Sequence, residues 1–280
     1  MEKAKKLREM MAQGMVVAPF CMDAFHAKIA QLVGFEAAYM TGWGTSAARG
    51  FPDVGLITQT EMVQAARYIA NAVDIPIICD ADTGYGNPIN VWRTVREYES
   101  TGAAAIHIED QVFPKKCGFM AGKKVIAMEE HVQKIRAALD ARQDKDFVII
   151  ARCDALAVNG WEDTIRRCHA YCEAGADLIF VDGIRTREDL ETYAHKLHDL
   201  PKLYNAASVY LPIPEIAEMG FKITIHILTL QAVYQGVKKA FIELKEKGVM
   251  LKELQEQNMD EVADMMGVPA IYEMEQRYKV

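Results

Sequence analysis

The feature that most constrains the fold is the alternation of eight short apolar runs with longer amphipathic stretches. Continuous apolar runs are typical of parallel strands that are buried on both faces, and the amphipathic stretches predict helices between them. Eight strand–helix units within about 250 residues favour a closed (β/α)8 barrel over an open doubly wound sheet. The predicted strands cover residues 15–20, 37–40, 75–80, 104–110, 147–155, 177–183, 200–206 and 221–226.

The chain has 280 residues and shows no linker, low-complexity segment or change of composition that would mark a domain boundary. We therefore expect an α/β protein with a single TIM-type barrel domain over residues 1–280. Helical stretches from about residue 248 to residue 280 form a C-terminal extension. Its apolar positions, Met259, Met265, Met266 and Met274 among them, can form a subunit interface.

Composition argues against several classes of function. The chain carries 32 Lys and Arg against 39 Asp and Glu, and the net charge of −7 disfavours electrostatic binding of nucleic acid. Its apolar runs fall short of the roughly 18 residues that span a membrane. The charged N-terminus lacks the apolar block of a signal peptide. Six cysteines without a CxxC pair indicate a reduced, cytoplasmic protein.

Polar residues gather where the predicted strands end, which is where a barrel of this type builds its active site. Alternate residues of a strand point to the same side, so His107 and Glu109 can converge with Asp80 and Asp82. Several carboxylates at one mouth repel each other unless a hard cation such as Mg²⁺ lies among them. Helix capping by single aspartates is the alternative. The strand-end set is Asp80, Asp82, His107, Glu109, Arg152, Asp154, Asp182 and Asn205.

Two loops add candidate groups. The glycine-rich segment 39–46 lets backbone N–H groups approach an anion closely, although an ordinary tight loop has the same composition. The segment 115–123 is long and charged, which suits a mobile lid. We expect its lysines to lower the pKa of Cys117 and to make the thiol a proton donor or a nucleophile. An incidental surface cysteine is the alternative.

Together these motifs resemble the isocitrate lyase/phosphoenolpyruvate mutase superfamily, and most of all its group of 2,3-dimethylmalate lyases, methylisocitrate lyases and oxaloacetate hydrolases. The similarity runs through residues 15–210 in the expected order and is weaker over the last 60 residues. The matching pieces are Tyr39-x-Thr41-Gly42, Phe51-Pro52-Asp53-x-Gly55-Leu56, Asp80-Ala81-Asp82-Thr83-Gly84-Tyr85-Gly86, His107-Ile108-Glu109-Asp110-Gln111, Lys115-Lys116-Cys117-Gly118 and Ile150-Ala151-Arg152-x-Asp154-Ala155.

The resemblance implies a barrel that binds Mg²⁺, or Mn²⁺ in its place, and a small 2-hydroxy or 2-oxo carboxylate. It implies that Asp82 contacts the metal directly. The carboxylates that would hold the metal's water ligands are Asp53, Asp80 and Glu109. The substrate-binding positions that it implies are Thr41, Gly42, Trp43, His107, Gly118, Arg152, Asp182 and Asn205.

More specifically, the resemblance assigns the substrate carboxylate to the backbone of residues 41–43 and the oxyanion to Arg152. Members are usually homotetramers in which paired subunits exchange a C-terminal helix, which suits the apolar tail of this chain.

The cysteine of the lid separates the carbon–carbon lyases of this superfamily from the phosphonate enzymes. Cleavage of a 2-hydroxy acid between C2 and C3 leaves an enolate-like carboxylate, which a positioned acid must protonate. We expect Cys117 to be that acid, with Lys116 beside it. Arg152 and magnesium would stabilise the C2 oxygen, and Tyr39 is the candidate base.

Three positions depart from the pattern of the lyases. Phe119 stands where they have His, Asp182 ends the sixth strand where Glu is usual, and Ser208 lies near the place of another Glu. All three positions normally surround the lid cysteine. Their joint change leaves open which group partners the acid and which substrate the site takes. Phe119 also makes the site less polar, which favours an apolar substituent at C3.

The leading hypothesis is a Mg-dependent lyase that cleaves a small 2-hydroxy dicarboxylate, of the 2,3-dimethylmalate or 2-methylisocitrate type, to pyruvate and a short carboxylic acid. The alternatives are an oxaloacetate hydrolase or decarboxylase, then a phosphonate mutase or hydrolase, and finally a barrel that binds an oxoacid without catalysis.

Overall fold

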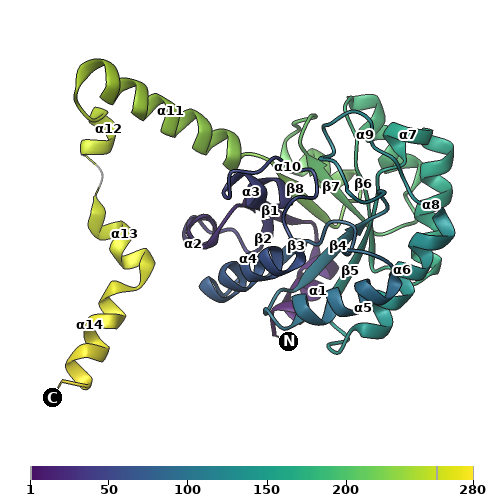
Figure 1. The fold of residues 1–280 in the computed structure, drawn as a ribbon, viewed down its shortest axis with the longest axis horizontal. Coiled ribbons are helices and arrows are strands. Elements are labelled where there is room, and N and C mark those ends of the chain that lie inside the picture. Colours follow the sequence, from purple (N-terminus) through teal and green to yellow (C-terminus); the bar gives the residue numbers. More distant parts are fainter. Residues whose placement is uncertain (1, 257, 280) are drawn as a thin grey trace.

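The computed structural model describes residues 2–256 and 258–279, so Met1, Gln257 and Val280 of the predicted domain lie outside the described residues. Eight parallel strands pair in chain order and β8 pairs with β1, which closes the barrel (Figure 1). The predicted (β/α)8 fold is therefore confirmed. The strands are β1 (Val16–Cys21), β2 (Ala38–Met40), β3 (Ile77–Asp80), β4 (Ala105–Glu109), β5 (Val148–Cys153), β6 (Leu178–Val181), β7 (Lys202–Ala206) and β8 (Ile223–His226).

Side-chain caps fix where several helices begin. Asp23, Thr58, Asn87 and Thr186 each accept a backbone N–H from the first turn of the helix that follows. The helices are α1 (Glu2–Gln13), α2 (Ala24–Leu32), α3 (Gly42–Ala47), α4 (Gln59–Ala72), α5 (Pro88–Glu99), α6 (Met128–Ala141), α7 (Leu156–Asn159), α8 (Trp161–Glu173), α9 (Arg187–Lys196), α10 (Ile213–Glu218), α11 (Thr229–Lys247), α12 (Lys252–Gln255), α13 (Met259–Met266) and α14 (Val268–Arg277).

Successive residues of the strands serve two hydrophobic layers. Ile78, Ile150 and Phe180 pack together in the interior of the barrel. Their neighbours Ile77 and Ile149 belong to the layer between the strands and the helices. This alternation explains why the strands read as continuous apolar runs, since both faces of the sheet are covered.

The amino-terminal helix α1 closes the end of the barrel opposite the strand carboxyl ends. Its residues Ala4, Leu7 and Met11 are buried in the interior layer. Arg8 fixes the helix from outside, because its Nη2 lies 2.8 Å from Asp177 Oδ1. With this end sealed, the mouth at the other end is the face on which a site can form.

After β8 the chain leaves the barrel as an arm of helices α11 to α14 (Figure 1). Among the described residues of α11, α13 and α14, none is buried, and Tyr234, Phe241 and Ile271 are exposed. Lys28 Nζ of α2 donates a hydrogen bond to the Met265 carbonyl at 3.2 Å. The arm starts at Thr229, and it is longer than the extension from residue 248.

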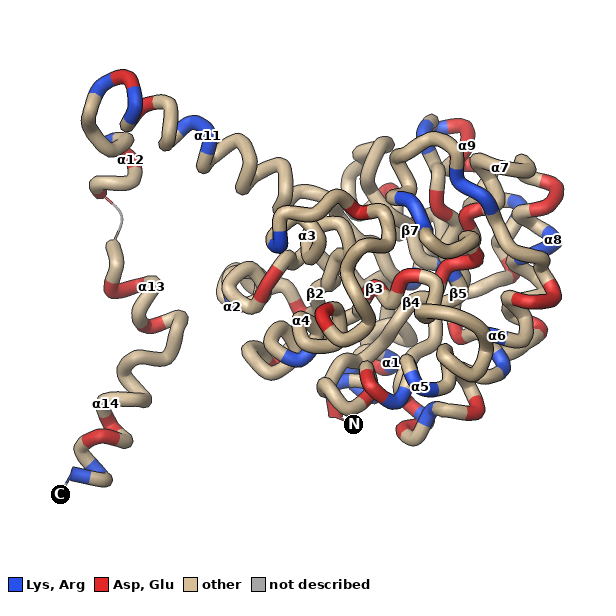
Figure 2. Tube along the Cα trace, viewed as in Figure 1, with Lys and Arg blue, Asp and Glu red and all other residues tan. Residues whose placement is uncertain are grey.

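Acidic segments lie beside β3, β4 and β5 within the outline of the barrel (Figure 2). These strands carry the predicted carboxylates into the mouth. Across the part of the chain that the structure describes, the helices are too short or too polar to cross a bilayer.

Candidate active site

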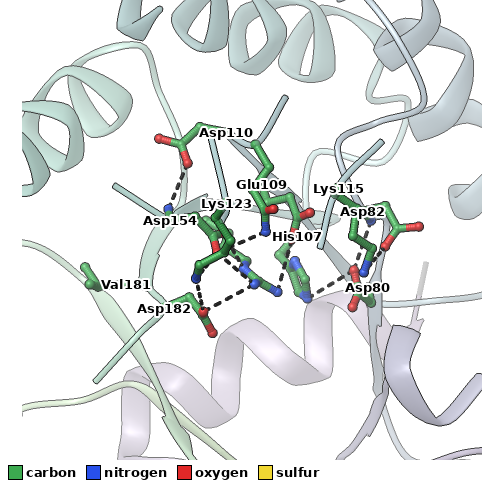
Figure 3. Close-up of polar contacts among 12 residues, drawn as sticks. Asp80, Asp82, His107, Glu109, Asp110, Lys115, Lys123, Asp154, Val181 and Asp182 are labelled. Atoms are coloured by element: carbon green, nitrogen blue, oxygen red, sulfur yellow. Dashed lines mark hydrogen bonds and ion pairs between the residues drawn. The ribbon is translucent and has the colours of Figure 1, made fainter. Parts of the chain in front are cut away.

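The polar residues of the strand ends meet at one mouth of the barrel (Figure 3). Strand register places Asp80 beside His107 and Glu109 beside Arg152. All four side chains are buried, and Asp182 is buried just beyond β6. The structure thus brings together the residues that the sequence placed at neighbouring strand ends.

Asp80 is held in place by the backbone. It accepts the N–H of Gly42 at 3.1 Å and the N–H of Asp82 at 2.9 Å. A Cβ on Gly42 would lie 2.5 Å from Asp80 Oδ2, so this approach requires glycine. Burial opposes the ionisation of Asp80, but the charges of His107 and the nearby cations prevail and lower its pKa. Burial raises the pKa of Asp82 to about 6.

A buried lysine from the lid offsets the charge of the acidic cluster. Lys115 Nζ lies 2.5 Å from Asp53 Oδ1 and 2.8 Å from Asp82 Oδ1. Burial alone would lower the pKa of Lys115, but the carboxylates around it, Asp82 and Glu109 foremost, raise it well above its usual value. Lys115 therefore stays charged among the carboxylates that the sequence assigned to a metal.

The same carboxylates suit a hard divalent cation. Within residues 2–256 and 258–279, no three His, Cys, Asp or Glu side chains form a ready metal-binding group. Glu109 Oε1 is nevertheless buried without a hydrogen-bond partner, and Oε2 lies 3.2 Å from Arg152 Nη1. Burial raises the pKa of Glu109 well above the usual range. Open carboxylate oxygens beside Asp53 and Asp82 are the donors that Mg²⁺ and Mn²⁺ prefer. The residues fit such a cation, and Lys115 is the group that it would displace.

Tyr39 and His107 form a hydrogen-bonded pair deep in the mouth. The Tyr39 hydroxyl lies 2.7 Å from His107 Nε2, and the two rings stack at 5.7 Å. Burial lowers the pKa of His107 to about 4 and raises that of Tyr39 well above its usual value. At neutral pH the imidazole is neutral and the phenol keeps its proton. Tyr39 can take up a proton only by passing its own to His107.

The expectation that lysines lower the pKa of Cys117 is wrong. Burial and the charge of Asp53 raise the pKa of the thiol to about 11. The positive charges of Lys115 and Arg152 act in the opposite direction and do not prevail, because both cations are paired with carboxylates. Cys117 is a neutral thiol at physiological pH, which suits a proton donor better than a nucleophile.

The sequence indicated Lys116 as the lysine of the site, but the lid places other lysines there. Lys116 is exposed, and its Nζ donates to the Ala121 carbonyl at 3.3 Å. Lys115 and Lys123 are the buried lysines of the lid. The lid itself is fixed by Gln111, which exchanges hydrogen bonds of 2.9 and 3.0 Å with the Lys116 backbone.

Arg152 is surrounded by carboxylates at the centre of the mouth. Its guanidinium lies 3.2 Å from Glu109, 2.8 Å from Asp154 and 3.5 Å from Asp182. It also packs over the ring of Phe180 at 5.2 Å. Sequence reasoning placed Arg152 here but gave no role to Asp154, which lies in the same motif, or to Lys123, which ends the lid segment 115–123.

A small cleft with an internal volume of about 20 Å³ lies between the lid and the ends of β6 and β7. The three departures from the family pattern share its wall. A Cβ on Gly118 would lie 2.1 Å from Asp182 Oδ2, so the lid touches this carboxylate directly. Phe119 packs against Trp43 with ring centroids 6.2 Å apart. The lining includes Gly118, Phe119, Asp182, Asn205 and Ser208.

The backbone of residues 41–43 begins helix α3. The Thr41 N–H donates to the Cys21 carbonyl at 3.3 Å, and the Gly42 N–H donates to Asp80. Two of the three backbone N–H groups that were expected to bind the substrate carboxylate are thus bonded within the protein. The N–H of Trp43, in the first turn, is the donor left for that role.

Comparison with known proteins shows similarity over most of the chain. A family model described as phosphoenolpyruvate phosphomutase matches residues 7–245. 2,3-Dimethylmalate lyase of Eubacterium barkeri is 41% identical over 99% of this chain and 99% of that protein. 2-Methylisocitrate lyase of Aeropyrum pernix is 42% identical over 86% of this chain and 80% of its own length.

Solved structures show the same relationship. One is a 2,3-dimethylmalate lyase described as a PEP mutase/isocitrate lyase superfamily member, with a TM-score of 0.92, 36% identity and coverage of 99% of this chain and 95% of that one. The other is an oxaloacetate acetylhydrolase, with a TM-score of 0.92, 35% identity and coverage of 98% and 96%. Because similarity of this extent runs through barrel, lid and arm alike, the chain belongs to the PEP mutase/isocitrate lyase superfamily and is a carbon–carbon lyase of that superfamily.

Proposed function

We propose that the protein is a magnesium-dependent lyase that cleaves a small 2-hydroxy dicarboxylate between C2 and C3 into pyruvate and a short carboxylic acid. The observation that carries the proposal is the neutral thiol of Cys117, held in the lid at the oxygen-rich mouth. A protonated acid at this place can deliver a proton to the carbon that the cleavage leaves negative. The names of the lyase relatives add support.

The chain's own residues account for each proton and electron pair. Tyr39 takes the proton of the C2 hydroxyl as its own passes to Nε2 of His107. The C2–C3 electron pair moves onto C3 and its carboxylate, while the C2 oxygen becomes the carbonyl of pyruvate. Cys117 gives its proton to C3, and the proton held by His107 restores the thiol after the products leave. Arg152 holds the developing charge on the C2 oxygen.

The metal has a defined place in this proposal. We assign Asp82 as the direct ligand and leave its water ligands to Asp53, Asp80 and Glu109. Magnesium bound there supplies a Lewis acid for the C2 oxygen.

The cleft favours 2,3-dimethylmalate over 2-methylisocitrate as the substrate type. Phe119 lines the cleft, packs against Trp43 and lies two residues from the lid thiol, which suits a methyl group at C3 better than a carboxymethyl group. The test is pyruvate release, coupled to lactate dehydrogenase, from 2,3-dimethylmalate, 2-methylisocitrate and 2-methylmalate with magnesium. We expect release from 2,3-dimethylmalate and its loss with a chelator. No release from any of the three would refute the lyase proposal.

The second candidate is an oxaloacetate hydrolase or decarboxylase that uses the same metal site. It is favoured by the likeness to the oxaloacetate acetylhydrolase structure. Because oxaloacetate decarboxylates spontaneously, the products must be identified directly. Oxalate and acetate would establish the hydrolase. A phosphonate mutase or hydrolase ranks below both, since the lid carries Cys117.

We further propose a cytoplasmic homotetramer in which paired subunits exchange their arms. Val237, Phe241 and Ile242 form an exposed apolar face on α11, and Phe25 and Ile29 form another on α2. The α11 face of one subunit would pack against the α2 face of a second copy, and both faces would then be shielded from water. The six free cysteines agree with a reducing compartment. Light scattering coupled to gel filtration gives the mass of the assembly.

A further inference from the structure

Asp154 joins the catalytic arginine to the base of the lid. Its carboxylate accepts hydrogen bonds from Arg152 Nε at 2.8 Å and from Arg152 Nη2 at 3.1 Å. It also accepts from Lys123 Nζ at 2.8 Å and from Gln111 Nε2 at 3.1 Å. Its own N–H donates to Asp110 Oδ1 at 2.8 Å, which fixes the hub from behind. Figure 3 shows Lys123, Asp154 and Asp182 in contact beside the centre of the mouth.

The charges around Arg152 do not balance without Lys123. Asp154 and Asp182 both lie within 3.5 Å of its guanidinium, so two carboxylates face one positive group. Such a group repels an incoming anion, since charges act over longer range in a poorly solvated site. Lys123 Nζ lies 2.8 Å from Asp154 and 3.0 Å from Asp182, and it offsets one of these negative charges.

Lys123 also supports the lid next to the thiol. Asp182, which it holds, packs directly against Gly118, the residue that follows Cys117. The lid returns to the barrel at this point, where Val112 N donates to the Lys124 carbonyl at 2.8 Å. One ammonium group is thus tied both to the carboxylate that holds Arg152 and to the one that touches the thiol's segment.

We propose that Lys123 is a positioning residue: through Asp154 and Asp182 it leaves the charge of Arg152 available to the substrate oxyanion and sets the lid beside Cys117. It acts through these carboxylates and does not touch the substrate. The inference rests on the proposed function only in naming the oxyanion that Arg152 receives.

The test measures the binding of oxalate, a planar dianion that resembles the enolate of pyruvate, by calorimetry in saturating magnesium. Lys123→Met should weaken binding by about ten- to a hundredfold, the effect of removing one charge several ångströms away at an effective dielectric constant of about 20. Lys124→Met is the matched control, because it removes the same charge from an exposed neighbour. Lys123→Arg should retain most of the affinity.

A second variant keeps the test sharp if Lys123→Met folds poorly. Lys123→Met with Asp182→Asn removes one positive and one negative charge together, so oxalate affinity should recover at least in part. Equal oxalate affinity in Lys123→Met and Lys124→Met would overturn the proposal. So would a folded double variant with no recovery.

Turnover separates this inference from the proposed function. If 2,3-dimethylmalate is cleaved, Lys123→Met should raise KM and lower kcat, while Lys124→Met changes neither. If no hydroxy acid of the panel is cleaved but the difference in oxalate binding persists, the proposed function fails and the role of Lys123 stands.

Discussion

The barrel mouth and the C-terminal arm depart from ordinary protein surfaces in opposite directions. The mouth buries charged groups such as Lys115 and Asp154, which proteins keep in water unless they are paired. The arm exposes Phe241, Tyr234 and Ile271, whose side chains proteins tend to bury. The difference indicates that the two regions bind different kinds of partner. We expect a cation and a small anion at the mouth, and another protein surface at the arm.

The largest effect should follow from removing the acid of the mouth. Cys117→Ser replaces the thiol by a hydroxyl of much higher pKa, so it should lower kcat by about 10² to 10⁴, the usual contribution of a general acid. Magnesium and oxalate binding should not change, because neither needs the thiol proton. Steady-state pyruvate release and calorimetry measure the two properties. Full activity of the variant would show that another group supplies the proton.

The rate at which Cys117 reacts with an alkylating reagent tests whether burial raises the pKa of its thiol. With a pKa of about 11, roughly one thiol in a thousand is ionised at pH 8, against about one in ten for an unperturbed cysteine. Alkylation by iodoacetamide should therefore be about a hundredfold slower than for a free thiol and should rise with pH up to about 11. Peptide mass spectrometry follows Cys117 by itself. A rate that levels off near pH 8 would mean that the lid lysines do lower its pKa.

Sequence patterns located the strands and the mouth because both follow from short-range rules. Apolar runs marked the strands to within a few residues, as at 15–20 for β1 (Val16–Cys21). Parallel strands of a closed barrel end at one mouth, so residues 27 apart, Asp80 and His107, were expected to meet.

The lid and the arm lie beyond such rules. Side chains in an irregular loop have no periodicity, so the sequence could not tell that Lys115 turns inward and Lys116 outward. The pKa of Cys117 was misjudged for the same reason, since it depends on the burial of the thiol and on the pairing of the nearby cations with carboxylates. The apolar face of α11 has the same period whether it covers its own barrel or another chain.

Magnesium should stabilise the mouth without affecting the arm. A ligand at about a hundred times its Kd adds about 2.7 kcal/mol to the free energy of unfolding, which a thermal melt reports as a higher Tm. Asp82→Asn should lose this gain, because it removes the carboxylate that we assign as direct ligand. Its matched control, Asp264→Asn, removes an equal charge from α13 in the arm and should keep it. If magnesium raised the Tm of Asp82→Asn as much as that of the unchanged protein, the metal would have to bind elsewhere than at the end of β3.

The smallest effect on the mouth should come from the arm itself. Phe241→Glu places a charge on the exposed apolar face of α11, so the assembly should dissociate toward the 31.4 kDa chain. Gln235→Glu adds the same charge outside that face and should leave the mass unchanged. The stabilisation by magnesium should differ by less than about 0.5 kcal/mol in either variant, since the described part of α11 buries no residue in its own barrel. A loss of magnesium binding with the assembly would mean instead that a neighbouring arm completes the mouth, and the two regions would then be one site.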